Sequence, residues 1–343
     1  MSTVLVTGGS GFIGRNLIET LLFRGHRVRC LVRNPKANVI LEDLGGELIA
    51  GDLHDHACLQ EAVAGCDVVY HLAGMTAAIT VAELMKVNRD GTANLAEAMA
   101  FQPNPPLLLL VSSMAAAGPA ARGQVRIEAD PPAPISNYGR SKLGGEEEAK
   151  LRADRIPLTI VRPGCVFGPH DKAALPMFQM IQRFRFHPVP GWRHPPLSWI
   201  YVTDLVEHII LAAERGERVP AATARMPQAH PGVGIYFGAV PEHPSYAEFG
   251  AMTRQVLRRP YMPVIPLPSA VSFFVASVNE TFSWLRGRPD LFNRDKIREA
   301  QVDSWACSHE KSFQQLGFEP GKPLQERIND AVEWYQQRGM LWN

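Results

Sequence analysis

Three residues of this chain have the types and the spacing that proton and hydride chemistry at a carbonyl requires. Tyr138 and Lys142 are four residues apart, so they share one face where the segment is helical. A free tyrosine has a pKa of about 10, and an adjacent ammonium lowers that pKa and suits the phenol to general acid/base work. Ser113 follows the apolar run 107–111 and would donate a hydrogen bond to a substrate oxygen. We predict Ser113, Tyr138 and Lys142 as the catalytic residues.

A glycine-rich turn near the start of the chain predicts a dinucleotide site. The apolar run 3–6 leads into Thr7-Gly8-Gly9-Ser10-Gly11-Phe12-Ile13-Gly14, and helical periodicity follows. Such a turn lets backbone N–H groups approach a pyrophosphate, and its last glycine lets the helix pack against the sheet. The pattern alone arises by chance, but its position between a strand and a helix supports the site. The alternative is a plain turn without a ligand.

The end of the second predicted strand bears on the choice of nicotinamide cofactor. A site that prefers NAD places Asp or Glu there to hold the ribose 2′-hydroxyl. This chain has Val32 and then Arg33, with Lys36 nearby. Because a guanidinium suits a 2′-phosphate, we predict NADP(H) in preference to NAD(H). The alternative is that Arg33 is a solvated loop arginine.

Other strand ends complete the predicted cofactor site. The Asp52 carboxylate would accept a hydrogen bond from the adenine amino group, or else Asp52 caps a helix. Asn88 would place an amide near Lys142, or else acts as a cap or a buried packing amide. No metal site is predicted. The predicted cofactor contacts are Gly8, Ser10, Gly11, Phe12, Ile13, Gly14, Arg33, Lys36, Asp52, Leu53, Leu72, Ala73, Gly74, Asn88, Ser112, Tyr138, Lys142, Pro163, Gly164 and Val166.

Alternating apolar strands and amphipathic helices must position these residues. Such alternation predicts an α/β fold, a Rossmann doubly wound parallel sheet whose ligand lies beyond the carboxyl ends of the strands. The expected strands are 3–6, 28–32, 47–50, 68–72, 107–111 and 158–162, and the expected helices between them are 13–22, 59–64, 92–100 and 141–152.

The pattern breaks after Gly164, where proline and aromatic residues accumulate over 165–198. We expect an NAD(P)-binding Rossmann domain made of 1–164 and about 199–240. A smaller, interleaved C-terminal substrate domain would comprise about 165–198 and 241–343. Later elements are expected at 199–202 (strand) and at 204–213, 245–257, 270–285, 294–300 and 324–339 (helices).

Composition narrows the class of protein. The formal net charge of the 343 residues is +1, so no global field attracts nucleic acid. The five cysteines include no Cys-x-x-Cys pair, which argues against a zinc site or a disulfide framework and fits a reduced, cytoplasmic setting. The apolar stretch 266–285 favours a buried amphipathic helix. The alternative is a patch that rests on a membrane or lines the entry of an apolar substrate.

Taken together, these residues resemble the extended short-chain dehydrogenase/reductase family, also called the NAD(P)-dependent epimerase/dehydratase family. The family's Thr-Gly-x-x-Gly-x-x-Gly pattern matches 7–14, and its Ser/Tyr/Lys triad matches Ser113, Tyr138 and Lys142. The family spacing favours Ser113 over its neighbour Ser112. An Arg-Pro-x-x-Val-(Tyr)-Gly-Pro segment matches 162–169 with Phe167 in place of Tyr, and a Val-x-Asp-Leu segment matches 202–205. The resemblance implies a Rossmann domain with a smaller substrate domain, often in a homodimer.

Within that family, the C-terminal third is most similar to the 3β-hydroxysteroid dehydrogenase and sterol-4-carboxylate dehydrogenase branch. The similar segments are 293–299, 304–308, 316–320 and 332–335. Members of this branch often carry an acid after the second strand, which this chain lacks. Dihydroflavonol-reductase-like enzymes share the basic cofactor end.

The leading functional prediction is an oxidoreductase that interconverts a secondary alcohol and a ketone, with Tyr138 as general acid/base. The substrate would be a small, apolar, cyclic, steroid-like molecule held against Phe167, Phe184, Phe186, Trp192, Phe273 and Phe274, although ordinary core is the alternative for these aromatics. A second possibility is a nucleotide-sugar epimerase or dehydratase, with Arg183, Arg185 and Arg193 on the diphosphate. A third is a non-enzymatic scaffold that binds NADP(H) and a partner.

Overall fold

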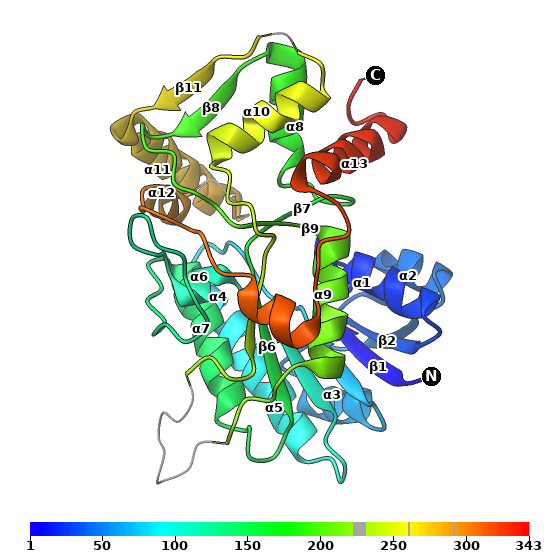
Figure 1. The fold of residues 1–343 in the computed structure, drawn as a ribbon. Helices are drawn as coiled ribbons and strands as arrows, with labels where there is room; N and C mark the ends of the chain where they lie inside the picture. The colour runs from blue at the N-terminus through cyan, green and yellow to red at the C-terminus, as the bar shows by residue number, and fades with distance from the viewer. Residues whose placement is uncertain (222–230, 260, 288, 291–292, 343) are drawn as a thin grey trace.

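A seven-stranded parallel sheet forms the centre of the computed structural model, which describes residues 1–221, 231–259, 261–287, 289–290 and 293–342 (Figure 1). The strand order is β10-β6-β5-β4-β1-β2-β3. This order places β1 between β2 and β4, so the strand order reverses there and leaves a crevice at the carboxyl ends of the strands. The strands are β1 (Thr3–Thr7), β2 (Arg27–Val32), β3 (Glu47–Ala50), β4 (Val68–His71), β5 (Leu107–Val111), β6 (Leu158–Pro163) and β10 (Ile235–Gly238).

Helices cover both faces of this sheet, which confirms the doubly wound α/β fold. One face packs against α1 and α9 through residues such as Leu17 and Ile209, and the other against α3 and α5 through Leu59 and Leu95. These side chains are fully buried, as expected for a parallel sheet buried on both faces. The elements around the sheet are α1 (Phe12–Phe23), η1 (Pro35–Ala37), α2 (Val39–Asp43), α3 (His56–Val63), α4 (Val81–Met85), η2 (Lys86–Asp90), α5 (Gly91–Ala100), α6 (Met114–Ala117), α7 (Asn137–Lys150) and α9 (Val202–Arg215).

Helix α7 begins at Asn137, four residues before the predicted start. The cause is Ser136, whose hydroxyl accepts a hydrogen bond of 3.0 Å from the Gly139 N–H and caps the helix. Tyr138 therefore lies in the first turn of α7, and Lys142 lies one turn further along the same helix.

A smaller group of elements lies at one end of the sheet (Figure 1). It contains two short parallel strand pairs, β8 with β11 and β7 with β9, and the chain enters it from β6 and again after β10. Its elements are β7 (Cys165–Phe167), α8 (Leu175–Phe184), β8 (His187–Pro190), β9 (Trp199–Tyr201), α10 (Tyr246–Val256), β11 (Val264–Leu267), α11 (Ser269–Arg286), α12 (Arg294–Ala300) and α13 (Leu324–Gln337).

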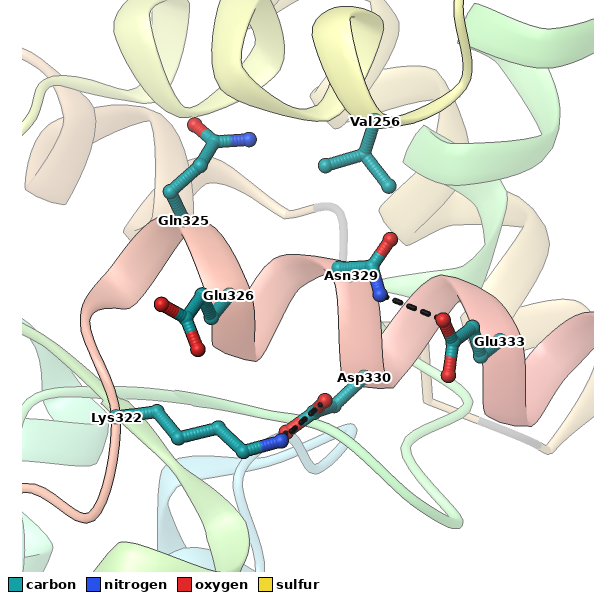
Figure 2. A pocket seen from close by; sticks show the side chains of 7 residues that line it. All are labelled: Val256, Lys322, Gln325, Glu326, Asn329, Asp330 and Glu333. Carbon is teal, nitrogen blue, oxygen red and sulfur yellow. Dashed lines mark hydrogen bonds and ion pairs between the residues drawn. The ribbon is translucent and has the colours of Figure 1, made fainter.

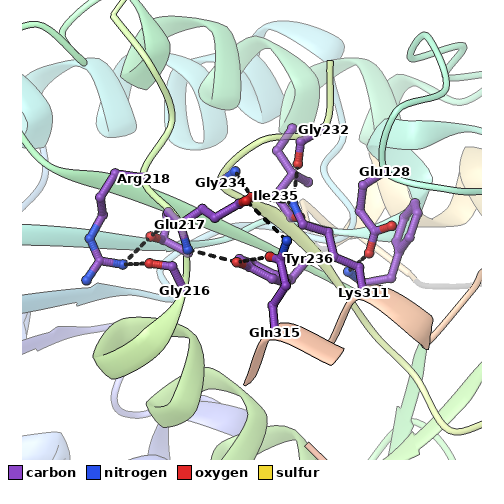
Figure 3. Close-up of polar contacts among 12 residues, drawn as sticks. Glu128, Gly216, Glu217, Arg218, Gly232, Gly234, Ile235, Tyr236, Lys311 and Gln315 are labelled. Carbon is purple, nitrogen blue, oxygen red and sulfur yellow. Dashed lines mark hydrogen bonds and ion pairs between the residues drawn. The ribbon is translucent and has the colours of Figure 1, made fainter. Parts of the chain in front are cut away.

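The chain returns to the sheet between α12 and α13 and covers the edge strand β10. Lys311 donates hydrogen bonds to the Gly232 and Ile235 carbonyls at 2.6 and 3.1 Å, and the Tyr236 hydroxyl donates to Gln315 at 2.7 Å (Figure 3). The turn η3 (Ser312–Leu316) begins directly after Lys311. These contacts protect an edge strand that would otherwise present unpaired backbone groups.

Helix α11 exposes much of its apolar surface. Val271, Phe274, Val275 and Val278, which we expected to be buried, are 39–70% exposed. Ser272 and Ala276 supply the buried side of the helix instead. Within the described residues, no helix is both long and apolar enough to cross a membrane.

Candidate active site

The turn between β1 and α1 is shaped for close backbone approach. Gly8 has φ +75°, and a Cβ there would lie 2.6 Å from the Ala73 nitrogen. A Cβ on Gly14 would lie 2.3 Å from the Gly8 carbonyl oxygen, so only glycine fits this helix start. Ser10 and Gly11 are exposed, while Phe12 and Ile13 are half-buried in the first turn.

The N-terminus of α1 can receive an anion. Gly11 stands at the N-cap position, and no side chain among the described residues caps α1 there. The first N–H groups of a helix have no intrahelical partner and carry partial positive charge, which favours a pyrophosphate. The residues present therefore fit a dinucleotide at this turn.

Two exposed cations follow β2, where the ribose end of such a dinucleotide would lie. Arg33 and Lys36 are exposed, and within the described part of the chain neither makes a hydrogen bond or an ion pair. Asn34 fixes the turn between them by accepting a hydrogen bond from the Ala37 N–H. Arg29 is turned away, since it donates to the Ala64 carbonyl at 2.7 Å.

The residues after β3 contribute a turn and a buried leucine. Asp52 accepts a hydrogen bond of 3.0 Å from the His54 N–H. Helix α3 is capped by Asp55, which accepts from the Cys58 N–H, so the alternative that Asp52 caps a helix is wrong. Leu53 is 8% exposed and packs in the core, and its carbonyl accepts a hydrogen bond of 2.9 Å from the Asn94 amide.

The segment 72–74 after β4 lies against two of the predicted site residues, Asn88 and Lys142. A Cβ on Gly74 would lie 3.0 Å from Asn88 Oδ1 and 3.6 Å from Lys142 Nζ. Leu72 and Ala73 are half-buried, and a Cβ on Gly8 would touch the backbone of both.

Asn88 is buried and fully engaged within the protein. Its amide donates to the Met75 carbonyl at 2.9 Å and to Ser141 Oγ at 2.8 Å, and its oxygen accepts from the Met75 N–H at 2.8 Å. These contacts tie the segment after β4 to helix α7. They favour the packing alternative for Asn88 over a direct cofactor contact.

Lys142 and Tyr138 lie at the carboxyl end of β5. The Lys142 ammonium donates to the Val111 carbonyl at 2.9 Å, and burial lowers the pKa of Lys142 to about 8. Burial raises the pKa of Tyr138, while a hydrogen bond with Ser113 and the positive charge of Lys296 lower it. The three predicted catalytic residues are thus brought together at one strand end.

The two adjacent serines have different partners. Ser112 is buried and donates to Glu146 Oε1 at 2.5 Å, and Glu146 forms a two-point ion pair with the buried Arg162 at 2.9 and 2.6 Å. Ser113 is half-buried, accepts from the Ala115 N–H at the start of α6, and bonds to Tyr138. The geometry therefore favours Ser113 as the serine that meets a substrate.

Pro163, Gly164 and Val166 surround the passage from β6 to β7. Pro163 is buried, Val166 packs against the main core, and a Cβ on Gly164 would lie 2.4 Å from the Ser198 carbonyl oxygen. Cys165 between them is exposed.

The sequence pattern did not predict that α12 would reach this site. Lys296 Nζ lies 5.5 Å from the centre of the Tyr138 ring and pairs with Glu299 at 2.6 Å. Asp295 accepts a hydrogen bond of 2.7 Å from the Asn137 N–H at the start of α7. No local signal marks these residues, because their proximity to Tyr138 depends on how a distant segment packs.

The aromatics expected to line a substrate site are dispersed. Phe167 is fully buried and packs edge-on against Trp199, Tyr201 and Phe249, so its expected role as a substrate contact is wrong and its core alternative is correct. Phe184, Trp192 and Phe274 are 59–73% exposed, whereas Phe186 and Phe273 are half-buried.

A hollow of about 450 Å³ lies elsewhere, between α10 and α13 (Figure 2). None of the predicted site residues lines it. Charged and amide side chains line most of it, including a Lys322–Asp330 pair at 2.8 Å, so it lacks the apolar walls of a typical ligand site. Its lining residues are Val256, Lys322, Gln325, Glu326, Asn329, Asp330 and Glu333.

Comparison with known proteins identifies relatives of this architecture. The model of the NAD dependent epimerase/dehydratase family matches residues 4–224. A 4-hydroxy-2-methyl-3-oxo-4-farnesyl-3,4-dihydroquinoline-1-oxide ketoreductase of Stigmatella aurantiaca is 36% identical over 220 residues, which make up 62% of this chain and 64% of that protein. A ceramide reductase of Caulobacter vibrioides is 28% identical over 346 residues, and this match covers 98% of this chain and 96% of that protein.

A sterol-4-alpha-carboxylate 3-dehydrogenase of Dictyostelium discoideum is 28% identical over 63% of this chain and 69% of that protein. A 3-beta-hydroxysteroid dehydrogenase of Mycolicibacterium neoaurum is 30% identical over 65% of this chain and 63% of that protein. These relatives confirm the resemblance to that branch. Among solved structures, the UDP-glucose 4-epimerase of Thermotoga maritima has a TM-score of 0.77 with 18% identity, over 98% of this chain and 99% of its own. This likeness shows the fold alone. Other solved neighbours contain NAD.

Proposed function

The chain belongs to the NAD dependent epimerase/dehydratase family, and from that premise we propose that it interconverts a secondary alcohol and a ketone on an apolar, cyclic substrate. The observation that carries the proposal is the convergence of Ser113, Tyr138 and Lys142 beside the glycine turn. Tyr138 bonds to Ser113, and Lys142 lies at the same strand end with its ammonium held by the Val111 carbonyl.

The glycine turn 8–14 and the N-terminus of α1 would hold the pyrophosphate of the dinucleotide. The nicotinamide, when bound, supplies or accepts the hydride at the reacting carbon. In reduction, Tyr138 donates its phenolic proton to the developing alkoxide while Ser113 donates a hydrogen bond to the same oxygen. In oxidation, the deprotonated Tyr138 removes the hydroxyl proton. The Lys142 ammonium stabilises that phenolate, since opposite charge favours the ionised form.

We also propose that NADP(H) is preferred. Arg33 and Lys36 are exposed cations after β2 with their donors free of protein partners in the described chain. No acidic side chain stands between Val32 and Lys36 to hold a 2′-hydroxyl. A guanidinium in this position recognises a 2′-phosphate through paired N–H donors.

Support for an apolar substrate comes from the relatives. The ketoreductase name includes a farnesyl group next to a 3-oxo group, and the ceramide reductase and the sterol dehydrogenase are also named for lipids. Half-buried Phe186 and Phe273 supply apolar surface in the smaller group of elements.

The alternative is a nucleotide-sugar epimerase, because the UDP-glucose 4-epimerase has the same fold. The contacts made by two of the arginines expected to bind a diphosphate argue against this alternative. Arg183 stacks on Phe184, 5.4 Å from its ring centre, and Arg193 pairs with Asp303 at 3.0 Å on an exposed surface. A non-enzymatic scaffold has no use for the Tyr138/Lys142 pair.

The test is nicotinamide absorbance with the pure protein, NADP(H) and NAD(H) in parallel, and hydroxysteroids, smaller cyclic alcohols, their ketones and nucleotide sugars as substrates. Net hydride transfer with an apolar alcohol or ketone supports the proposal. Isomerisation of a nucleotide sugar without net absorbance change would replace it with the epimerase.

A further inference from the structure

Lys296 is a second cation at the predicted catalytic tyrosine, and it comes from the smaller group of elements. Its ammonium lies 5.5 Å from the Tyr138 ring centre, whereas the Lys142 ammonium bonds to the Val111 carbonyl. Burial raises the pKa of Tyr138, and the positive charge of the nearby Lys296 opposes that rise. The proposed alcohol–ketone chemistry does not use this residue.

One hydrogen bond caps α12, and another joins α12 to α7. Asn293 caps the helix by accepting from the Lys296 N–H at 3.0 Å, and Asp295 accepts from the Asn137 N–H of α7 at 2.7 Å. Tyr138 follows Asn137 in α7, and Lys296 follows Asp295 in α12. The hydrogen bond from the Asn137 N–H to the Asp295 carboxylate therefore holds the ammonium close to the phenol.

The Lys296 ammonium retains donors for a ligand. A lysine has three N–H donors, and Glu299 accepts one of them at 2.6 Å. The Lys296 side chain is 41% exposed, whereas the Glu299 side chain is 12% exposed. Glu299 thus accepts from one N–H of the ammonium, and no other acceptor for the remaining donors lies among the described residues.

We propose that Lys296 is a specificity-determining residue that donates a hydrogen bond to an oxygen substituent on the substrate carbon next to the reacting carbon. The substrate class is a secondary alcohol or ketone with a neighbouring hydroxyl or carboxylate. We place the adjacent substrate carbon on the side of this ammonium, because the ammonium lies 5.5 Å from the centre of the ring whose hydroxyl would bond the reacting oxygen. This inference rests on the proposed alcohol–ketone function and deepens it.

Three bicyclic alcohols test the inference: 1-tetralol, tetralin-1,2-diol and 1-hydroxytetralin-2-carboxylate. Their oxidation is to be measured with the wild-type protein and with Lys296→Met, with NAD⁺ and NADP⁺ in parallel. Because Lys296→Met removes a hydrogen bond from a charged donor, it is expected to lose about 10- to 100-fold in kcat/KM on the oxygen-bearing alcohols. The loss on 1-tetralol should be under about threefold. The diol and the carboxylate separate a neutral from an anionic oxygen.

Arg294→Met is the matched control. Arg294 lies on the same helix and pairs with Glu280 at 2.5 Å rather than with Asp295. Its side chain is 56% exposed and makes no contact with Tyr138 among the described residues. It should change none of the three values. Lys296→Arg should restore part of the preference, and the thermal midpoints of all variants show whether each is folded.

The outcomes distinguish a failure of the proposed Lys296 role from a failure of the proposed alcohol–ketone function. Equal losses on all three alcohols, or no loss on any, would overturn the role of Lys296 while leaving the alcohol–ketone function intact. If folded wild-type protein oxidises none of these alcohols and reduces none of the ketones of the wider panel, the proposed function fails and this inference fails with it.

Discussion

The carboxylate of Asp295 accepts a hydrogen bond of 2.7 Å from the backbone N–H of Asn137, 158 residues away in the chain. The first N–H groups of a helix lack intrahelical partners, so Asp295 satisfies one of them and places negative charge at the start of α7. Tyr138 is the next residue. The smaller group of elements thereby holds the catalytic helix directly.

Asp295→Ala should destabilise the protein by about 1 kcal/mol, the usual effect of losing a helix-capping side chain. Turnover of alcohols with a neighbouring oxygen should fall more than this loss of stability explains, because α12 no longer fixes Lys296 beside Tyr138. Chemical denaturation and steady-state kinetics measure the two effects. Asp303→Ala, at an exposed ion pair, is the control. Unchanged turnover in Asp295→Ala would contradict the coupling.

Glu146→Ala should be severely destabilising. Glu146 and Arg162 are both fully buried, and removing the acid leaves the guanidinium charged and unpaired inside the protein. Loss of one partner of a buried ion pair costs about 3–5 kcal/mol. The free energy of unfolding from denaturant titration measures this, with exposed Glu147→Ala as the control. A loss below about 1 kcal/mol would show that the pair contributes little.

The lowered pKa of Lys142 predicts a pH dependence of the free energy of unfolding. Burial lowers its pKa from 10.5 to about 8, so between pH 8 and 10.5 the unfolded chain binds more protons than the folded protein. Stability relative to Lys142→Met should therefore rise with pH through this window, by up to about 3 kcal/mol, and stay level below it. Denaturation of the cofactor-free proteins from pH 7 to 11 measures the difference. A constant difference would place the pKa of Lys142 at its ordinary value.

Arg33→Ala tests the cofactor preference. If Arg33 binds a 2′-phosphate, kcat/KM for NADPH should fall about 10- to 100-fold, as expected for one lost charge-assisted hydrogen bond pair, while the value for NADH stays unchanged. Arg122→Ala, an exposed arginine outside the predicted site, is the control. Equal effects on both cofactors would mean that Arg33 is a solvated loop residue.

Much of the sheet could be predicted from sequence, because buried parallel strands are continuous apolar runs. Leu107–Val111 was predicted without error, and the other five predicted strands differ from the observed ones by one residue at most at each end. Strand β10 was missed, since its four residues follow a proline- and glycine-rich segment. Strands β8 and β11 were missed for a different reason. Each contains proline, which argues against a strand except in small, edge-like pairings such as theirs.

The candidate site likewise has one part that local sequence patterns predict and another part that they do not. The glycine turn and the Tyr138/Lys142 spacing are local patterns, so the sequence alone was enough to find them. Their surroundings depend on tertiary packing, which no local pattern encodes. The competition between Ser112 and Ser113 is decided by Glu146, and Lys296 reaches Tyr138 because Asp295 of α12 bonds to the start of α7.

The most direct test of the central claim compares wild-type protein with Tyr138→Phe in nicotinamide absorbance and in cofactor binding by titration calorimetry. The account predicts that Tyr138→Phe binds NADP(H) as the wild type does and loses about 10²- to 10⁴-fold in turnover of an alcohol or ketone, the usual contribution of a positioned acid/base. Undiminished turnover in a folded Tyr138→Phe protein would contradict the assignment of Tyr138 as the general acid/base.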